Sequence, residues 1–223
     1  MMKVMSGERT LREILGRTAS AYEGKLGVYA RIRRRLVPDL FFADAVEVFS
    51  TSRSVVDLGC GIGLFTLALA QLLPDTRFLG IDLSARRVQT AALAAGRLGV
   101  GNVTFLQSDL RSLDVGPGFD GALILDVLHH LPVRASGQLL AVLNQGMVHG
   151  AVVVVKEIDT RPRWKWAFTY ALDLAMAPRD DYGYLSLERR KAQMEDAGFK
   201  VRFARSLRSR LPYPHFVVIA ERP

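Results

Sequence analysis

The chain has 223 residues, enough for one sizeable α/β domain, and 49% of them are hydrophobic, which excludes wholesale disorder. No apolar run is long enough to span a bilayer, so the sequence predicts no integral membrane segment. Residues 1–12 lack the apolar stretch of a secretory signal, and the single cysteine, Cys60, cannot form an internal disulfide. We therefore expect a cytoplasmic protein.

The net charge is strongly positive, at +8. The arginines form two clusters, at Arg31, Arg33, Arg34 and Arg35 and at Arg202, Arg205, Arg208 and Arg210. A basic surface of this kind can attract nucleic acid, anionic lipid headgroups or an acidic carrier protein, and it can equally serve only to keep the protein in solution.

The predicted elements alternate between helix and strand along most of the chain. From about Leu11 to Phe49 the apolar spacing predicts two or three helices, with Pro38 between two of them. The elements expected after them are a strand at Val55–Leu58, a helix ending near Leu73, a strand at Arg77–Asp82, a helix at Ala85–Leu98, strands at Val103–Gln107 and Phe119–Leu125, a helix at Arg134–Val148, a strand at Ala151–Lys156, a helix at Leu187–Ala197, and strands at Phe199–Phe203 and His215–Ala220. This alternation favours a doubly wound, mostly parallel sheet, and the last two strands should pair antiparallel because no helix separates them.

A glycine turn at the end of the first strand is the most specific motif. Asp57 precedes Gly59, Gly61 and Gly63 with the spacing Asp-x-Gly-x-Gly-x-Gly, and a helix-prone segment follows. A dinucleotide site has the spacing Gly-x-Gly-x-x-Gly, and a P-loop ends in Gly-Lys-Ser/Thr. A carboxylate at this position would repel a pyrophosphate but suits a ligand that carries an ammonium group. The turn therefore predicts a cofactor that lacks phosphate.

This run resembles motif I of the class I S-adenosylmethionine (SAM)-dependent methyltransferases, and the resemblance covers about residues 55–222. It implies SAM as cofactor, S-adenosylhomocysteine as product, and an α/β fold with a seven-stranded, mostly parallel sheet, helices on both faces and a C-terminal antiparallel hairpin. We expect a single domain: an N-terminal helical cap (1–50), a SAM-binding core (51–158), a lid or acceptor insertion (159–187), and a C-terminal helix and hairpin (188–223).

Acidic residues end the next strands, where ligands of open α/β sheets bind. Asp82 lies at about the distance expected of a ribose-binding carboxylate, with Leu83 beside it; otherwise it only neighbours the Ser84 helix cap. In the family, the position of Ser108, Asp109 and Leu110 meets the adenine, although loop capping is an alternative role.

The fourth strand leads into Asp126, and the segment from Asp126 to Pro132 resembles motif IV of small-molecule methyltransferases, where residues contact the methionine part of SAM. The Asn/Asp-Pro-Pro-Tyr/Phe signature of DNA amino-methyltransferases is absent, so we expect no DNA substrate. The chain has His149-Gly150 where the family often has Gly-Gly. Cys60 lies inside the glycine turn, where we interpret it as a small packing residue of the cofactor site.

Methyl transfer needs a general base only if the acceptor must lose a proton. His129 and His130 are the histidines near the predicted site, and we favour His130 as the base. Both can also be structural residues of a Leu-His-His-Leu-Pro turn, and Glu157 and Asp159 are further candidates. No metal site is expected.

Residues 161–178 form an aromatic-rich insertion of helix length. Trp164, Phe168 and Leu172 recur at helical spacing, as do Trp166, Tyr170 and Leu174, which makes two faces apolar. We interpret the insertion as a lid over an apolar acceptor pocket, in which Trp164, Phe168, Tyr170 and Tyr184 contact the substrate and Tyr182, Tyr213 and His215 lie near the rim. Core packing is the alternative, and the basic-aromatic start could also lie at a membrane interface or stack on bases.

The sequence thus predicts a SAM-dependent methyltransferase that acts on a small-molecule or lipid-like acceptor, with oxygen as the expected methylated atom. One alternative is an RNA or protein methyltransferase that uses the basic surface. Another is a protein of this fold that binds SAM without methylating anything.

Overall fold

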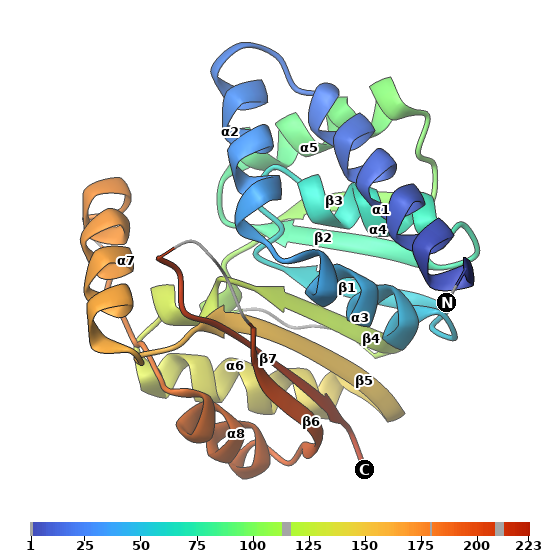
Figure 1. Ribbon diagram of the computed structural model, residues 1–223. Coiled ribbons are helices and arrows are strands. Elements are labelled where there is room, and N and C mark those ends of the chain that lie inside the picture. Colours follow the sequence, from blue (N-terminus) through green and yellow to red (C-terminus); the bar gives the residue numbers. More distant parts are fainter. Residues whose placement is uncertain (1, 113–116, 179, 208–211) are drawn as a thin grey trace. The chain divides into compact units, whose positions relative to one another are not determined.

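The computed structural model describes residues 2–112, 117–178, 180–207 and 212–223 (Figure 1). Its seven strands follow the order β3-β2-β1-β4-β5-β7-β6. β1 with β2, β2 with β3 and β4 with β5 pair in parallel, whereas β5 with β7 and β6 with β7 pair antiparallel. The predicted α/β fold class, with its mostly parallel sheet and antiparallel C-terminal hairpin, is confirmed. The chain forms two compact units, residues 1–109 and 110–223.

The first unit holds five helices and three strands in its described part. They are α1 (Met2–Ser20), α2 (Gly24–Leu36), α3 (Asp39–Phe49), β1 (Ser54–Leu58), α4 (Leu64–Leu72), β2 (Arg77–Asp82), α5 (Ala85–Leu98) and β3 (Val103–Gln107). β1 is almost wholly buried, as the continuous apolar run of a parallel strand predicts. α5 begins at Ser84, whose hydroxyl accepts from the Arg87 N–H, and ends at Gly99 in the left-handed conformation.

The second unit contains η1 (Leu110–Ser112), β4 (Phe119–Leu125), η2 (Leu128–His130), α6 (Val133–Gly146), β5 (Met147–Ile158), α7 (Arg163–Met176), α8 (Leu187–Asp196), β6 (Lys200–Leu207) and β7 (His215–Glu221). β4, β5 and β7 are mainly apolar, and Val153, Val154 and Val155 of β5 are fully buried. Arg208 and Arg210 of the second predicted arginine cluster lie outside the described residues.

Two strands are longer than predicted: β5 begins at Met147 rather than Ala151, and β6 ends at Leu207 rather than Phe203. The apolar spacing placed residues 134–148 in a helix, whereas α6 ends at Gly146 and β5 begins at Met147. Met147 is buried and pairs with Phe119, and the register shifts between Phe119 and Gly121. This irregularity lets β5 begin before Gly150, where φ is +76°. Pairing with β4 therefore places Met147 and Val148 in a strand, although their local apolar pattern also fits a helix.

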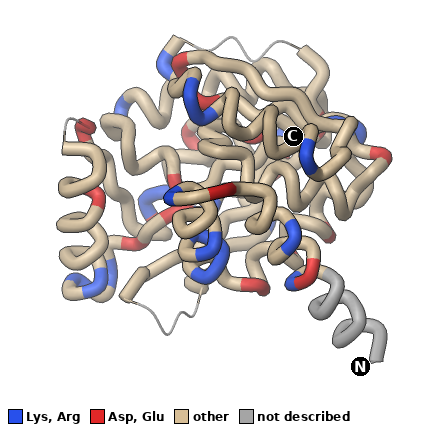
Figure 2. The backbone as a smooth tube through the Cα atoms, turned by 90° about the horizontal axis from the view of Figure 1, so that it is seen from above, with Lys and Arg blue, Asp and Glu red and all other residues tan. Residues whose placement is uncertain are grey.

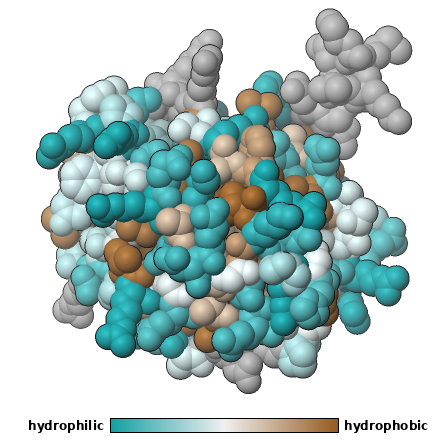
Figure 3. Space-filling model, turned by 90° about the horizontal axis from the view of Figure 1, so that it is seen from below, coloured by the Kyte–Doolittle hydropathy of each residue, from teal (hydrophilic) through white to brown (hydrophobic). Residues whose placement is uncertain are grey.

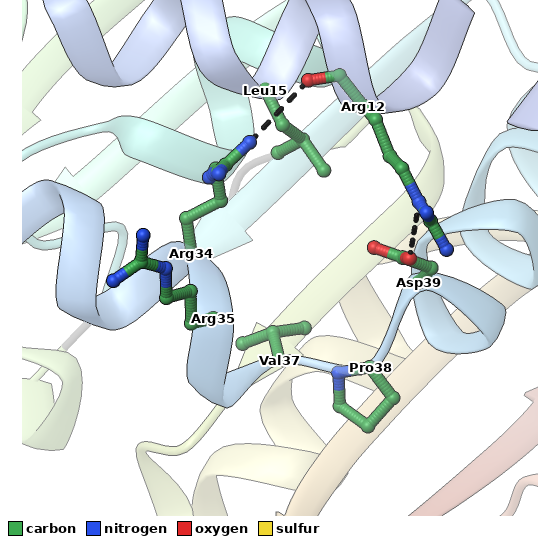
Figure 4. Close-up of a pocket in the computed structure, with 7 residues that line it drawn as sticks. All are labelled: Arg12, Leu15, Arg34, Arg35, Val37, Pro38 and Asp39. Atoms are coloured by element: carbon green, nitrogen blue, oxygen red, sulfur yellow. Dashed lines mark hydrogen bonds and ion pairs between the residues drawn. The ribbon is translucent and has the colours of Figure 1, made fainter. Parts of the chain in front are cut away.

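The N-terminal helices of unit 1 pack around a small hollow. Arg12, Arg34 and Arg35 line it together with Leu15, Val37, Pro38 and Asp39, and its volume is about 370 Å³ (Figure 4). Arg12 pairs with Asp39 at 2.8 Å, and Arg34 donates to the Arg12 carbonyl at 3.5 Å. Part of the first arginine cluster is thus engaged in contacts between helices.

Two side chains of α1 and the turn after it contact the segment that follows β1. The Tyr22 hydroxyl donates to the Ile62 carbonyl at 2.7 Å, and Gln71 donates to the Thr18 hydroxyl at 2.8 Å. The helical cap therefore braces the glycine turn of its own unit.

Among the described residues, no helix has both the length and the apolar character needed to cross a membrane. On the face seen in Figure 3, hydrophobic side chains gather in patches between hydrophilic ones.

Gly63→Ala should destabilise the protein more than Gly61→Ala. Both glycines have positive φ, which costs a non-glycine residue about 1–2 kcal/mol. A Cβ at Gly63 would also lie 2.8 Å from Ala91 Cβ and from Phe105 Cζ, whereas at Gly61 it would meet nothing within 4 Å. Overpacking adds about 1–3 kcal/mol. Urea unfolding of both variants checks the difference, and equal destabilisation would contradict it.

Candidate active site

The glycine turn of unit 1 is bound to the end of β2. The N–H groups of Gly59 and Cys60 donate to the Ile81 carbonyl at 2.7 and 2.9 Å. The Gly61 N–H donates to Asp82 Oδ2 at 2.9 Å. Gly59, Gly61 and Gly63 all have positive φ, the conformation that favours glycine. The sequence spacing thus produces a turn whose shape is fixed by the neighbouring strand.

Space around the turn differs from one glycine to the next. Gly63 and Gly80 lie tightly against Phe105, because a Cβ at either would come within 3 Å of its ring. A Cβ at Gly61 would meet nothing within 4 Å. The backbone at Gly61 is therefore open to a ligand, while Gly63 and Gly80 serve internal packing.

Two buried carboxylates lie beside this turn. Asp57 and Asp82 are 3% and 4% exposed. The Thr66 hydroxyl donates to Asp57 Oδ2 at 2.5 Å. Burial raises the pKa of Asp57 to about 7; the Thr66 hydrogen bond opposes this rise and the negative charge of Asp82 adds to it. A positively charged ligand would relieve the cost of keeping both groups ionised.

Asp82 has a second set of contacts. Its Oδ1 accepts from the Ser84 N–H at 2.9 Å, and Arg87 lies 3.8 Å from Oδ2 at an exposed position. The neighbouring Ser84 caps α5, as the alternative interpretation of this segment expected. Because each carboxylate oxygen has two lone pairs, these two backbone hydrogen bonds leave capacity for ligand hydroxyl groups.

The other predicted residues of unit 1 surround the same strand ends. Leu83 is 60% exposed directly after Asp82, and the Ser108 N–H donates to the Asp82 carbonyl at 3.2 Å. Asp109 follows Ser108 at the end of the unit. Burial, with Asp57 and Asp82 nearby, raises the pKa of the Cys60 thiol well above its usual range. Cys60 is therefore a poor nucleophile at neutral pH.

In unit 2, Asp126 forms a buried ion pair at the end of β4. Lys156 Nζ lies 2.6 Å from Asp126 Oδ1, and the Lys156 side chain is fully buried. The Asp126 N–H donates to the Lys156 carbonyl, and Asp126 has a φ of +55°, which is unusual for a non-glycine residue. The sequence analysis did not identify Lys156 as its partner. Leu110, the last residue predicted for the adenine, is buried in η1.

Glu157 holds the turn that carries both histidines. Its Oε1 accepts from the N–H groups of Val127 and Leu128 at 2.9 and 2.6 Å, and its Oε2 lies 2.5 Å from His129 Nδ1. Burial alone would raise the pKa of Glu157, but the charge and hydrogen bond of His129 lower it to about 2. Glu157 is thus an ionised carboxylate that orients His129.

The two histidines have opposite pKa shifts. Burial lowers the pKa of His129, but Glu157, Asp126 and Asp173 outweigh burial and leave the pKa above its ordinary value. Burial and the positive charge of His129 lower the pKa of His130. The surroundings therefore favour the protonated form of His129 and the neutral form of His130.

His130 is also the more accessible of the two. Its side chain is 32% exposed, against 2% for His129. His130 Nδ1 lies 2.8 Å from Asp180 Oδ2, which fixes the ring and leaves Nε2 available. The sequence analysis missed Asp180, since it is far from His130 in the chain and no spacing rule connects them.

An aromatic cluster adjoins the histidines. Tyr184 stacks on His129 with ring centroids 5.0 Å apart, and Tyr182 lies 5.4 Å from His130. Trp166 and Tyr170 of α7 stack on each other at 5.6 Å and contact Tyr184 edge to face. Tyr184 donates to Asp173, whose Oδ2 is also 3.6 Å from His129 Nε2. Of the predicted rim residues, Tyr213 stacks on His215 at 5.7 Å.

The predicted acceptor residues separate into two groups. Tyr170 and Tyr184 belong to the aromatic cluster, whereas Trp164 and Phe168 are 64% and 45% exposed. Thr169 is the single buried residue of α7. The helix is therefore not ordinary core: its Trp164 and Phe168 side remains exposed, whereas Trp166 and Tyr170 pack against Tyr184.

Comparison with known proteins gives the same picture. Residues 55–148 match a family model described as a methyltransferase domain. Ribosomal RNA small subunit methyltransferase G of Vibrio campbellii is 27% identical over 70% of this chain and 74% of its own. The tRNA (guanine-N(7)-)-methyltransferase of Porphyromonas gingivalis is 38% identical, but the matched part spans 27% of this chain and only 25% of that relative's length.

Two solved structures have a similar fold. Magnesium protoporphyrin IX methyltransferase from Synechocystis, with bound S-adenosylhomocysteine, is 20% identical and covers 98% of this chain and 95% of its own, with a TM-score of 0.67. Mitomycin 7-O-methyltransferase is 20% identical over 90% of this chain and 60% of its own, with a TM-score of 0.66. Residues 55–148 thus match a methyltransferase domain, and the strand order together with these structures shows the fold of the class I SAM-dependent methyltransferases.

Proposed function

We propose that this protein transfers the methyl group of SAM to an oxygen atom of a small-molecule or lipid-like acceptor. The observation that carries the proposal is the open glycine turn beside two buried carboxylates, Asp57 and Asp82. A turn that is open at Gly61, next to an acidic pocket, accepts a ligand with an ammonium group and hydroxyls but disfavours a pyrophosphate.

The residues that would hold SAM are those predicted from the strand ends. Asp57 and Gly59–Gly63 would meet its charged part, Asp82 and Leu83 its ribose, and Ser108, Asp109 and Leu110 its adenine. Asp126 is the candidate for the methionine part. When bound, SAM supplies a methyl group on a sulfonium that is already activated for transfer. What remains for the protein is to hold the acceptor in line, which can contribute about 7–11 kcal/mol to lowering the barrier.

On the acceptor side, His130 is suited to take a proton from a hydroxyl group. It is neutral at neutral pH, partly exposed, and oriented through Nδ1 by Asp180. His129 lies between Glu157 and Asp173, which favour its protonated form, so its role is to fix the turn and to add to burial in keeping the pKa of His130 low. Tyr170 and Tyr184 provide the aromatic contacts of an acceptor with an apolar or aromatic body.

Two of the structures with a similar fold, the methyltransferases of mitomycin and of magnesium protoporphyrin IX, support a small acceptor. The second candidate function is RNA methylation, which the names of the curated relatives and the net charge favour. In the view of Figure 2, however, Lys and Arg are interspersed with Asp and Glu over several elements and do not gather into one stripe. We therefore rank RNA second.

Incubation of the protein with methyl-labelled SAM and extract of its host cell tests the proposal. We expect enzyme-dependent label in the organic-soluble or small-molecule fraction, in a product that survives mild acid as an ether does. Label in RNA or protein would establish the second candidate and contradict the small acceptor. Absence of label from every fraction, with normal SAM binding, would contradict methyl transfer itself.

Asp82→Asn should weaken SAM binding at least tenfold while the protein remains folded. The amide keeps the size of the side chain and one acceptor oxygen but loses the negative charge and half of the acceptor sites. Asp196→Asn on the exposed part of α8 is the matched control. Titration calorimetry gives both affinities, and an unchanged affinity in Asp82→Asn would remove Asp82 from the cofactor site.

His130→Gln should lower turnover by about 10²–10⁴-fold with little effect on SAM affinity, because it removes the proton acceptor. Wild-type turnover should fall as the pH drops below neutrality, since protonation of His130 occupies Nε2, and Asp180→Asn should move this fall to lower pH because Asp180 raises the pKa. His149→Gln, at an exposed histidine of β5, is the control. Near-normal turnover in His130→Gln would make His130 a structural residue.

A further inference from the structure

α7 presents an apolar surface that the rest of its unit does not cover. Trp164 and Met176 are 64% and 72% exposed, and Phe168 and Leu174 are 45% and 44% exposed. Large exposed apolar side chains that adjoin one another usually mark a contact with a partner or a membrane. Here they occur along the whole length of one helix.

The exposed sides of this helix also carry no charge beyond its first turn. Asp173 is the one acidic or basic residue between Trp166 and Met176. Its carboxylate accepts from Tyr184 and lies 3.6 Å from His129 Nε2, so it is directed toward the interior of unit 2. At about 100° per residue, Trp164 and Phe168 project from one side of the helix, and Leu174 and Met176 flank that side on opposite edges. The Lys165 ammonium lies 5.6 Å from the Trp164 ring centroid, at the basic end of the helix. We name Trp164, Phe168, Leu174 and Met176 the α7 apolar face.

Basic residues gather at the N-terminal end of α7. Arg161 and Arg163 line a hollow of about 260 Å³ together with Thr160 and Trp166. Within the described part of the chain, the Trp166 indole N–H is buried and has no hydrogen-bond partner. In Figure 2, the coil at the left shows this basic end of α7. Two guanidinium groups and an unpaired N–H donor make the hollow suited to a phosphate group.

We propose that α7 docks the protein on an anionic phospholipid surface. The α7 apolar face enters the boundary between headgroups and acyl chains, and the hollow at Arg161 and Arg163 receives a lipid phosphate. Amphipathic helices bind membranes in this way, with apolar and tryptophan side chains on the lipid side and basic residues at the headgroups. The net charge of +8 adds long-range attraction to an anionic surface.

This inference goes beyond the proposed reaction, because docking needs neither SAM nor an acceptor. Basic residues beside an apolar helix are complementary to an anionic bilayer, because the bilayer has negatively charged headgroups directly beside apolar acyl chains. A second copy of the chain carries the same net charge of +8, so two copies that pack through this face would repel each other. The charge therefore favours lipid as the occupant.

Flotation with vesicles tests the apolar part of the proposal. We expect the protein to bind phosphatidylcholine vesicles that contain phosphatidylglycerol, and Trp164→Glu with Phe168→Glu to reduce binding at least tenfold. Leu93→Glu on α5 is the matched control, since Leu93 is 60% exposed in the other unit. Met176→Glu offers a second, independent variant at a more exposed position. Circular dichroism and SAM titration show whether the variants are folded, without using turnover.

The basic part has its own prediction. Arg161→Gln and Arg163→Gln should each weaken binding to the anionic vesicles about fivefold, and added salt should shrink that difference. Arg134→Gln on the exposed start of α6 should leave binding unchanged.

Three results would overturn the docking proposal. The first is failure of the wild type to float with anionic vesicles, and the second is undiminished flotation of folded Trp164→Glu, Phe168→Glu protein. The third is a concentration-dependent dimer, seen by sedimentation, that these substitutions abolish; in that case a second copy covers the α7 apolar face. None of these results depends on methyl transfer, so the proposed function would stand or fall separately.

Discussion

A carboxylate buried at the end of a strand must find a cation, a network of donors or a proton, because its charge is otherwise too costly in the interior. Four such groups in the described part of the chain are stabilised in two ways; a further one, Asp159 just after β5, accepts from the Arg161 N–H. In unit 2, Asp126 pairs with Lys156 and Glu157 pairs with His129, so each acid has an internal cation. In unit 1, the hydrogen bonds of Asp57 and Asp82 come from neutral donors, and the exposed Arg87 lies no nearer than 3.8 Å.

Because Asp126 and Glu157 have internal partners, we interpret them as structural, and we interpret Asp57 and Asp82 as available to bind a ligand. Asp57 is left with a pKa of about 7, a sign that its ionised form is under-compensated. The neighbouring glycine turn is open at Gly61, where a ligand can approach the backbone. The property that costs stability in the protein alone is thus the property that selects a ligand bearing a positive charge.

In the histidine pair, too, the charges of neighbouring groups determine the protonation of each side chain. His129 and His130 are neighbours in one turn, yet their surroundings move their pKa values in opposite directions. Glu157 favours the protonated form of His129, and the positive charge of that form adds to burial in lowering the pKa of His130. A neutral, partly exposed imidazole is thereby available at neutral pH, beside an aromatic cluster that can accommodate an apolar acceptor.

Sequence patterns predicted the strands and the glycine turn well because both depend on local rules. The bounds of the strands at Arg77–Asp82 and Val103–Gln107 follow from apolar runs between turn residues, and the structure reproduces them. The pairing of His130 with Asp180 was not predictable, since a long-range contact leaves no spacing signal. The periodicity of α7 identified apolar faces but could not say whether anything covers them. The start of β5 was missed because strand pairing with Phe119 overrode a local helical pattern.

Calorimetric titration of the purified protein with SAM, S-adenosylhomocysteine and NADH tests the central claim about the buried acids most directly. If Asp57 and Asp82 select a cationic ligand without phosphate, SAM and S-adenosylhomocysteine should bind and NADH should not, and Asp57→Asn should weaken the first two. Binding of NADH with an affinity close to that of SAM would contradict the account, because it would show that the acidic pair does not determine which cofactor the glycine turn accepts.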